Sequence, residues 1–181
     1  MPPLPPGRHL DLLLAALGTE ERAQRALLAG DREAALPEFA RAADLYRLSW
    51  RVAPPRSYGR LIGMLKAAVI AGDAQDEAIY ALASAGTACD SPPAAYVVAL
   101  AATVRGDDDL ARRAARAMRG GDGAFSRTAA ALEALANHDV EGYRTALREI
   151  VASFEEREEH LTGVAIADTA VMLDALAAAR G

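Results

Sequence analysis

The chain contains one cysteine, Cys89, and only 5% of its residues are aromatic. A single cysteine excludes a disulfide framework within the chain and any zinc site built from several cysteines. With few aromatic side chains, the core has to be built from alanine, leucine and valine, which favours closely packed helices over a β-sandwich. The alternation of apolar and polar residues that is typical of a half-buried strand is almost absent as well. These shortages predict an all-α protein.

Positive charge is also in short supply. The formal net charge of −5 argues against nonspecific binding to nucleic acid or to an anionic membrane. Lys66 is the only lysine among the 20 basic residues. The apolar run near the N-terminus is too short to cross a bilayer, and it follows prolines, whereas a signal peptide begins with basic residues. We therefore expect a cytoplasmic protein that binds neither nucleic acid nor membranes.

One short turn motif recurs along the chain. It occurs at Ala29-Gly30-Asp31, Ala71-Gly72-Asp73, Arg105-Gly106-Asp107 and, in altered form, Asn137-His138-Asp139. In each turn the glycine, or Asn137 in the last one, can end a helix in the left-handed conformation, and the aspartate can cap the next helix. The aspartates lie 42, 34 and 32 residues apart. Repeats of this length predict stacked helical hairpins, because one hairpin cannot bury its apolar face alone.

The turns divide the chain into a proline-rich arm, residues 1–7, and a single helical-repeat domain, residues 8–181. The predicted helices lie near 8–17, 19–29, 31–50, 57–71, 74–86, 93–104, 107–119, 124–136, 139–161 and 164–180. Over residues 19–160 the Gly-Asp turns and the small packing residues resemble tetratricopeptide-repeat-like proteins. The resemblance implies a right-handed α-solenoid of stacked antiparallel hairpins with nine or ten helices.

The segment 57–71 has two packing faces. Its larger apolar residues form one stripe, and Gly59, Gly63 and Ala67 form a groove of small residues on the broadly opposite side. Such a groove lets a neighbouring helix approach closely. A helix that requires contacts on two sides belongs in the middle of a stack.

The most distinctive segment is residues 41–66, which carry six basic residues and a single acid, Asp44. In its middle is a basic corner, residues 50–60, where the helical pattern breaks at Pro54-Pro55 and restarts at Ser57. It has two interpretations. As a binding site, it would hold an anion or an acidic partner with arginines beside free helix-start amides and with aromatic anchors. As a structural feature, it would be a capped corner whose arginines pair with acids elsewhere. Its candidate binding residues are Trp50, Arg51, Arg56, Ser57, Tyr58 and Arg60.

The stretch Ser153–His160 carries four carboxylates and a histidine. On a helical wheel only Glu158, with Arg157 at the edge, faces the apolar side. Asp168 is the second unusual acid: it either caps a helix that starts at Thr169 or is a partly buried carboxylate that needs a donor. We hypothesise that Glu158 and Asp168 reach arginines of the basic corner, or Arg144 or Arg148, because buried carboxylates usually pair with arginine.

No catalytic motif stands out. Cys89 has no histidine next to it in sequence, and His9, His138 and His160 are scattered without the spacing of metal ligands. We therefore expect no catalytic residue, no metal and no cofactor.

A family resemblance rests on three pieces of sequence. They are Ser49-Trp50-Arg51, Ala53-Pro54-Pro55-Arg56-Ser57, and a tail with Phe154-Glu-x-Arg-Glu-x-x-Leu-Thr-Gly163 and Ala167-Asp168-Thr169. Together they resemble a group of small actinobacterial helical proteins, and the chain is weakly similar to the immunity protein 49 family. Members of that family are described as all-helical, with a Trp and Arg signature, and are thought to neutralise partner toxins. Here Trp50 and Arg51 or Arg56 would carry the signature.

Three functions therefore remain open. The first is a non-enzymatic helical-repeat module that binds another protein, as an immunity or accessory protein. The second is a small helical enzyme or ligand-binding protein that uses Glu158 and Asp168 with Arg56 and Arg60. The third is a scaffold subunit that self-associates, for example as a homodimer. A closed pocket around Glu158 and Asp168 would favour the second function, and an open groove lined by Trp50, Tyr58 and arginines would favour the first.

Overall fold

The computed structural model describes residues 7–156 and 165–180. This part of the chain contains nine helices and no strand, which confirms the all-α prediction. The helices are α1 (Arg8–Leu28), α2 (Arg32–Val52), α3 (Gly59–Ala71), α4 (Gln75–Ala85), α5 (Pro92–Arg105), α6 (Asp108–Met118), α7 (Gly123–Ala136), α8 (Val140–Glu155) and α9 (Asp168–Arg180).

The first helix corrects the sequence prediction. Segments 8–17 and 19–29 were predicted as two helices separated at Gly18, but α1 continues through this glycine. The Thr19 hydroxyl donates to the carbonyl of Ala15 at 2.8 Å, as a residue inside a helix does, instead of capping a new helix. A lone glycine costs a helix only about 1 kcal/mol, which packing against α2 can offset.

Gly18 offers a direct stability test. A β-carbon at this position would have no heavy atom within 4 Å, and the residue has ordinary helical geometry. We expect Gly18→Ala to raise the free energy of unfolding by about 0.5–1 kcal/mol, because alanine loses less backbone entropy than glycine when a helix forms. Thermal denaturation should show a rise in Tm of about 1–4 °C. An unchanged or lower Tm would contradict the assignment of one continuous helix.

In three of the four repeated turns the aspartate caps the next helix as predicted. Asp31, Asp107 and Asp139 each accept a hydrogen bond from the backbone amide three residues later, at 2.9–3.0 Å. The turn Asn137-His138-Asp139 differs from the prediction in one respect. Its left-handed residue is His138, with φ 54°, and not Asn137. His138 directly precedes its aspartate, as the glycine does in the other turns.

The exception is the turn before α4. Gly72 is left-handed, with φ 95°, but Asp73 does not cap the helix, and the N-cap is Ala74 without a side-chain bond. In the other turns the helix starts at the residue directly after the aspartate, whereas α4 starts at Gln75, two residues after Asp73. The Asp73 carboxylate is therefore one position too early to reach the free amides, and the side chain is exposed.

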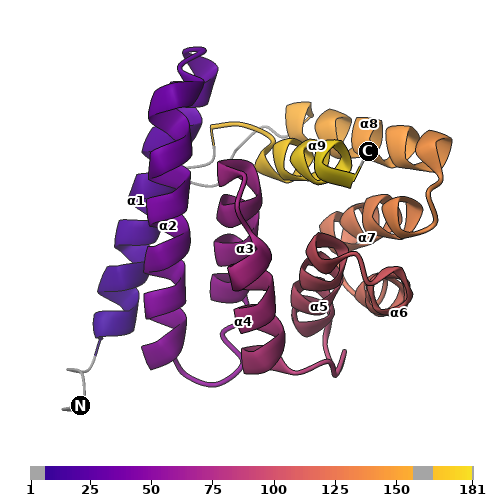
Figure 1. The fold of residues 1–181 in the computed structure, drawn as a ribbon, viewed down its shortest axis with the longest axis horizontal. Coiled ribbons are helices and arrows are strands. Elements are labelled where there is room, and N and C mark those ends of the chain that lie inside the picture. The colour runs from indigo at the N-terminus through magenta and orange to yellow at the C-terminus, as the bar shows by residue number, and fades with distance from the viewer. Residues whose placement is uncertain (1–6, 157–164, 181) are drawn as a thin grey trace.

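The helices pack in neighbouring pairs, as expected for an all-α helical repeat (Figure 1). Alternate helices α3, α5 and α7 also contact one another in that order. The last helix, α9, packs against α7 and α8 and then returns to α3, which lies about a hundred residues earlier in the chain. Figure 1 shows α9 and α8 to the right of the upper end of α3, above α5 and α7. Through α9, the C-terminal end of the chain is thus joined to the middle of the stack.

The small-residue groove on α3 accepts a neighbour as predicted. The ring of Tyr46 from α2 lies over Gly63, where a β-carbon would be only 2.7 Å from Tyr46 Cζ. Ala67 is fully buried, whereas Gly59 is exposed with open space around it. The close approach of α2 to α3 therefore depends on Gly63 and not on Gly59.

Over the residues that the structure describes, no helix has both the length and the apolar character that crossing a bilayer requires. The cytoplasmic location expected from the sequence stays a prediction.

Candidate functional site

The basic corner joins three helices through its aromatic and polar side chains. The rings of Trp50, near the end of α2, and Tyr58, just before α3, stack with centroids 5.9 Å apart and an interplanar angle of 26°. Arg60 donates from Nε to the Ser49 hydroxyl at 2.8 Å and from Nη2 to His9 Nδ1 at 3.1 Å. The fully buried Ser49 hydroxyl in turn donates to the His9 carbonyl at 2.6 Å. Arg60 therefore ties α1, α2 and α3 together.

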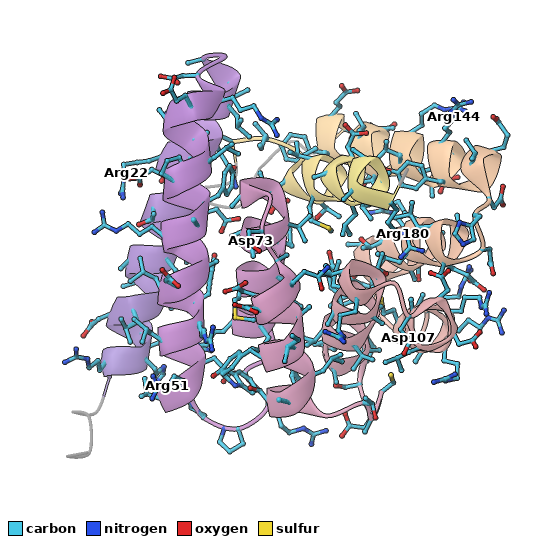
Figure 2. All side chains as sticks on the ribbon, in the orientation of Figure 1. Arg22, Arg51, Asp73, Asp107, Arg144 and Arg180 are labelled. Atoms are coloured by element: carbon cyan, nitrogen blue, oxygen red, sulfur yellow. The ribbon has the colours of Figure 1, made fainter. Side chains whose placement is uncertain are left out.

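The remaining residues of the corner have different roles. The Ser57 hydroxyl donates to the Pro54 carbonyl at 2.7 Å, and α3 starts at Gly59, so Ser57 does not cap α3 as the sequence suggested. Arg56 has a left-handed backbone, with φ 68°, and its exposed guanidinium lies 3.4 Å from Asp90. Arg51 is exposed at the end of α2, and Figure 2 shows it at the lower end of this helix. Of the three arginines predicted as binding residues, Arg51 and Arg56 are exposed, whereas Arg60 is bound to α1 and α2.

Asp168 contacts a different cation from the one predicted. It is the first residue of α9, and its carboxylate pairs with Lys66 Nζ of α3. The Lys66 side chain is 13% exposed and the Asp168 side chain is 18% exposed, so the pair is largely buried. Asp168 Oδ1 also accepts from the Thr169 amide at 2.7 Å. Asp168 is therefore the partly buried acid of the second alternative, and it binds lysine where an arginine was expected.

The arginines proposed as partners are engaged elsewhere. Arg144 pairs with Glu141 at 2.8 Å, and Arg148 donates to the Arg144 carbonyl. Glu158, the other acid of this hypothesis, lies outside the described residues. The expected role, linking the terminal helix to the stack, is confirmed for Asp168.

A second buried pair lies beside Lys66. The Tyr46 hydroxyl donates to Glu20 Oε2 at 2.6 Å, and both residues are buried. Burial raises the pKa of the Glu20 carboxyl, although the Tyr46 hydrogen bond and the charge of Lys66 partly oppose this. Burial is the largest single effect on Lys66 and lowers its pKa, but the charge and hydrogen bond of Asp168, together with the charges of Tyr96 and Glu20, give a net upward shift of the pKa. The Lys66 ammonium group thus forms an ion pair with Asp168 of α9, and its charge also stabilises the carboxylate of Glu20 on α1.

Sequence reasoning missed Glu20, Tyr46 and Lys66 as members of this buried cluster. Two signals were present: Lys66 is the only lysine in an arginine-rich chain, and Glu20 shares one helical face with Ala16 and Ala23. The second signal was lost because the predicted break at Gly18 divided that face between two helices.

An open groove lies between α2 and the start of α4, over the end of α3. We call it the α2–α4 groove, and its volume is about 410 Å³. Its apolar lining consists of Leu36, Pro37, Ala40, Ala43, Ala68 and Ala71. Its acidic lining consists of Asp44, Asp73, Asp76 and Glu77. The side chains thus form an apolar floor with carboxylates around it, three of which, Asp44, Asp73 and Asp76, belong to exposed residues.

A second groove of about 310 Å³ lies between the α3–α4 turn, α5 and α9. Asp73 lines both grooves, so they meet at this residue. Figure 2 shows Asp73 over the α3–α4 hairpin, between α2 and α9. Arg32 and Arg180 line the second groove. Arg180 is held by a pair with Asp108 and a 2.9 Å hydrogen bond to the Thr103 carbonyl.

A third groove, of about 380 Å³, lies between α7, α8 and α9. Tyr143 lines it, and burial together with the charge of Asp174 raises the pKa of Tyr143 to about 12. Neither Trp50 nor Tyr58 lines any of these three grooves. Residues 7–156 and 165–180 also contain no group of three or more His, Cys, Asp or Glu side chains placed to hold a metal ion.

No protein-family model, no curated protein and no solved structure matches this chain.

Proposed function

We propose that the chain is a non-enzymatic helical-repeat module that binds another protein in the α2–α4 groove. The observation that carries this proposal is the groove itself, which combines an apolar floor with a carboxylate rim on rigid helices. Stacked helical repeats present such extended surfaces to partner proteins. A groove that places small apolar side chains next to carboxylates offers both the apolar and the polar contacts that protein interfaces combine.

A narrower form of the proposal gives the partner a class. The resemblance to immunity proteins at Trp50, Arg51 and Arg56 supports a toxin-type partner. Arg51 and Arg56 are exposed and remain candidates for a second contact with that partner, whereas Arg60 holds the helices together.

The test is capture of partners from a lysate of the native host with variants that block the groove. Ala40 is exposed and lines the groove, so Ala40→Arg should fill the groove and leave the fold intact. Ala15→Arg on the outer side of α1 is the matched control, because Ala15 is exposed and lines none of the three grooves. We expect a protein that binds the wild type and Ala15→Arg but loses about tenfold or more of its affinity for Ala40→Arg. A partner set that is the same for both variants would reject the groove as the binding surface.

A further inference from the structure

We infer that the segment of the partner that occupies the α2–α4 groove is basic, with Lys or Arg side chains that reach the carboxylate rim. This inference rests on the proposed function and adds the chemistry of the partner to it. The first support is that three of the four rim carboxylates are not neutralised by any of the described residues. Asp44, Asp73 and Asp76 make no ion pair and no capping bond within the described residues, and Glu77 has only a 3.8 Å contact with Arg47.

Carboxylates elsewhere in the fold differ from the rim in this respect. Glu133 pairs with both Arg116 and Arg119, at 2.8 and 2.7 Å, and Asp108 pairs with Arg180 and contacts His138. These partners lower the pKa of the Glu133 and Asp108 carboxyls. Like charges that are left together without a counter-charge repel one another. A basic segment that enters the groove would relieve that repulsion.

Asp73 provides a second and independent support. In the other three turns the repeated aspartate caps the next helix, and its side chain is occupied by that bond. At Asp73 the late start of α4 removes the capping role, so the carboxylate is available at the point where two grooves meet. The turn keeps its left-handed glycine, so its backbone does not need Asp73 for its shape. The local geometry thus leaves this carboxylate free to contact a ligand.

Ammonium and guanidinium groups carry only hydrogen-bond donors, and carboxylates such as those of the rim satisfy them.

The floor suits the rest of a basic side chain. Ala40 and Pro37 present small, exposed apolar surfaces between the carboxylates. The methylene stems of Lys and Arg pack along such surfaces while their charged ends stay at the polar edge. An acidic segment would instead meet the carboxylates of the rim directly, at a cost of like-charge repulsion. Charge therefore selects a basic occupant.

The experiment is a charge swap read by fluorescence anisotropy. The probes are two labelled amphipathic helical peptides with leucine on one face, which differ only in carrying lysine or glutamate on the other face. The variant Asp73→Lys/Asp76→Lys reverses the rim, and Asp11→Lys/Glu149→Lys makes the same change in net charge at exposed acids outside the three grooves. The neutral variant Asp73→Asn/Asp76→Asn is included because it changes the fold least.

We expect the wild type and the Asp11→Lys/Glu149→Lys control to bind the lysine peptide more tightly than the glutamate peptide. We expect the rim-reversed variant to lose about tenfold or more for the lysine peptide and to gain affinity for the glutamate peptide. The neutral variant should lie between the two, and added salt should weaken wild-type binding. Equal binding of both peptides, or equal effects of the two reversed variants, would overturn the inference.

Two other outcomes separate this inference from the proposed function. If Ala40→Arg blocks partner capture but the peptides are not distinguished by charge, the groove binds a protein and only its basic chemistry is rejected. If the wild type forms concentration-dependent assemblies in light scattering that the rim reversal abolishes, the occupant is a second copy of this chain, and the inference of a separate basic partner is overturned.

Discussion

Lys66→Met should lower the free energy of unfolding by about 3–5 kcal/mol, the largest effect we expect from any single substitution. Within the described residues, Lys66 is the only cation paired with Asp168, and its charge also stabilises the ionised form of Glu20. Methionine preserves the apolar stem but leaves two largely buried carboxylates without a counter-charge. Buried carboxylates are not solvated by water, so their ionised form is destabilised when no counter-charge is present. Urea denaturation followed by circular dichroism measures the change.

The control for this substitution is a double-mutant cycle with Asp168→Asn. An asparagine side chain can still accept from the Thr169 amide at the start of α9, so the cycle isolates the charge pair. We expect the double variant to be more stable than the sum of the single changes predicts, with a coupling of about 0.5–3 kcal/mol. If Lys66→Met has the stability of the wild type, the pair does not hold α9 against α3.

The same variant should show a changed pH dependence. Removing Lys66 removes an interaction that lowers the pKa of Glu20, which burial already raises, so the pKa of Glu20 in the folded variant rises further. A carboxyl whose pKa is raised by folding contributes stability below its unfolded pKa, and this contribution is lost as the pH rises through the folded pKa. The deficit of Lys66→Met relative to the wild type should therefore be smaller at about pH 5 than at about pH 8.

Gly63→Ala should lower the free energy of unfolding by about 1–3 kcal/mol, although alanine favours a helix more than glycine does. The new β-carbon would lie 2.7 Å from the Tyr46 ring. The ring cannot easily move away because it is buried and its hydroxyl is bound to Glu20 at 2.6 Å. The substitution therefore has to push α2 away from α3 or break that hydrogen bond.

The matched control is Gly59→Ala, which makes the same chemical change in the same helix. Gly59 is exposed, with no heavy atom within 4 Å of an added β-carbon, so we expect a change within about 0.5 kcal/mol. Thermal and urea denaturation of the two variants measure the difference. Equal stability of the two variants would mean that the contact between Tyr46 and Gly63 does not set the distance between the helices.

The repeated turns show how far local sequence reaches. The Gly-Asp turn and its altered form Asn137-His138-Asp139 predicted the boundary between helices at all four turns, because capping involves only neighbouring residues. It failed in detail at Asp73, where the helix starts one residue later than in the other turns. α4 also packs on α5, and a capping pattern contains no information about such tertiary contacts.

The candidate site was less predictable than the fold. The corner around Trp50 and Arg60 was recognised as unusual, but the sequence left open whether its arginines face outward, and Arg60 faces inward. The α2–α4 groove was not foreseen, because its carboxylates come from α2, the α3–α4 turn and α4. Acids that lie far apart in a sequence form one rim only after the helices have stacked.

By itself, the amino-acid sequence determined the all-α class, the approximate positions of most helices and the small-residue contact at Gly63. These properties depend on periodicity, capping and side-chain size over a few residues. The tertiary structure alone decided that α9 returns to α3 and that Asp168 meets Lys66, 102 residues earlier in the chain. The physical reason is that a buried acid requires some cation, and only the stacking of the helices determines which one lies within reach.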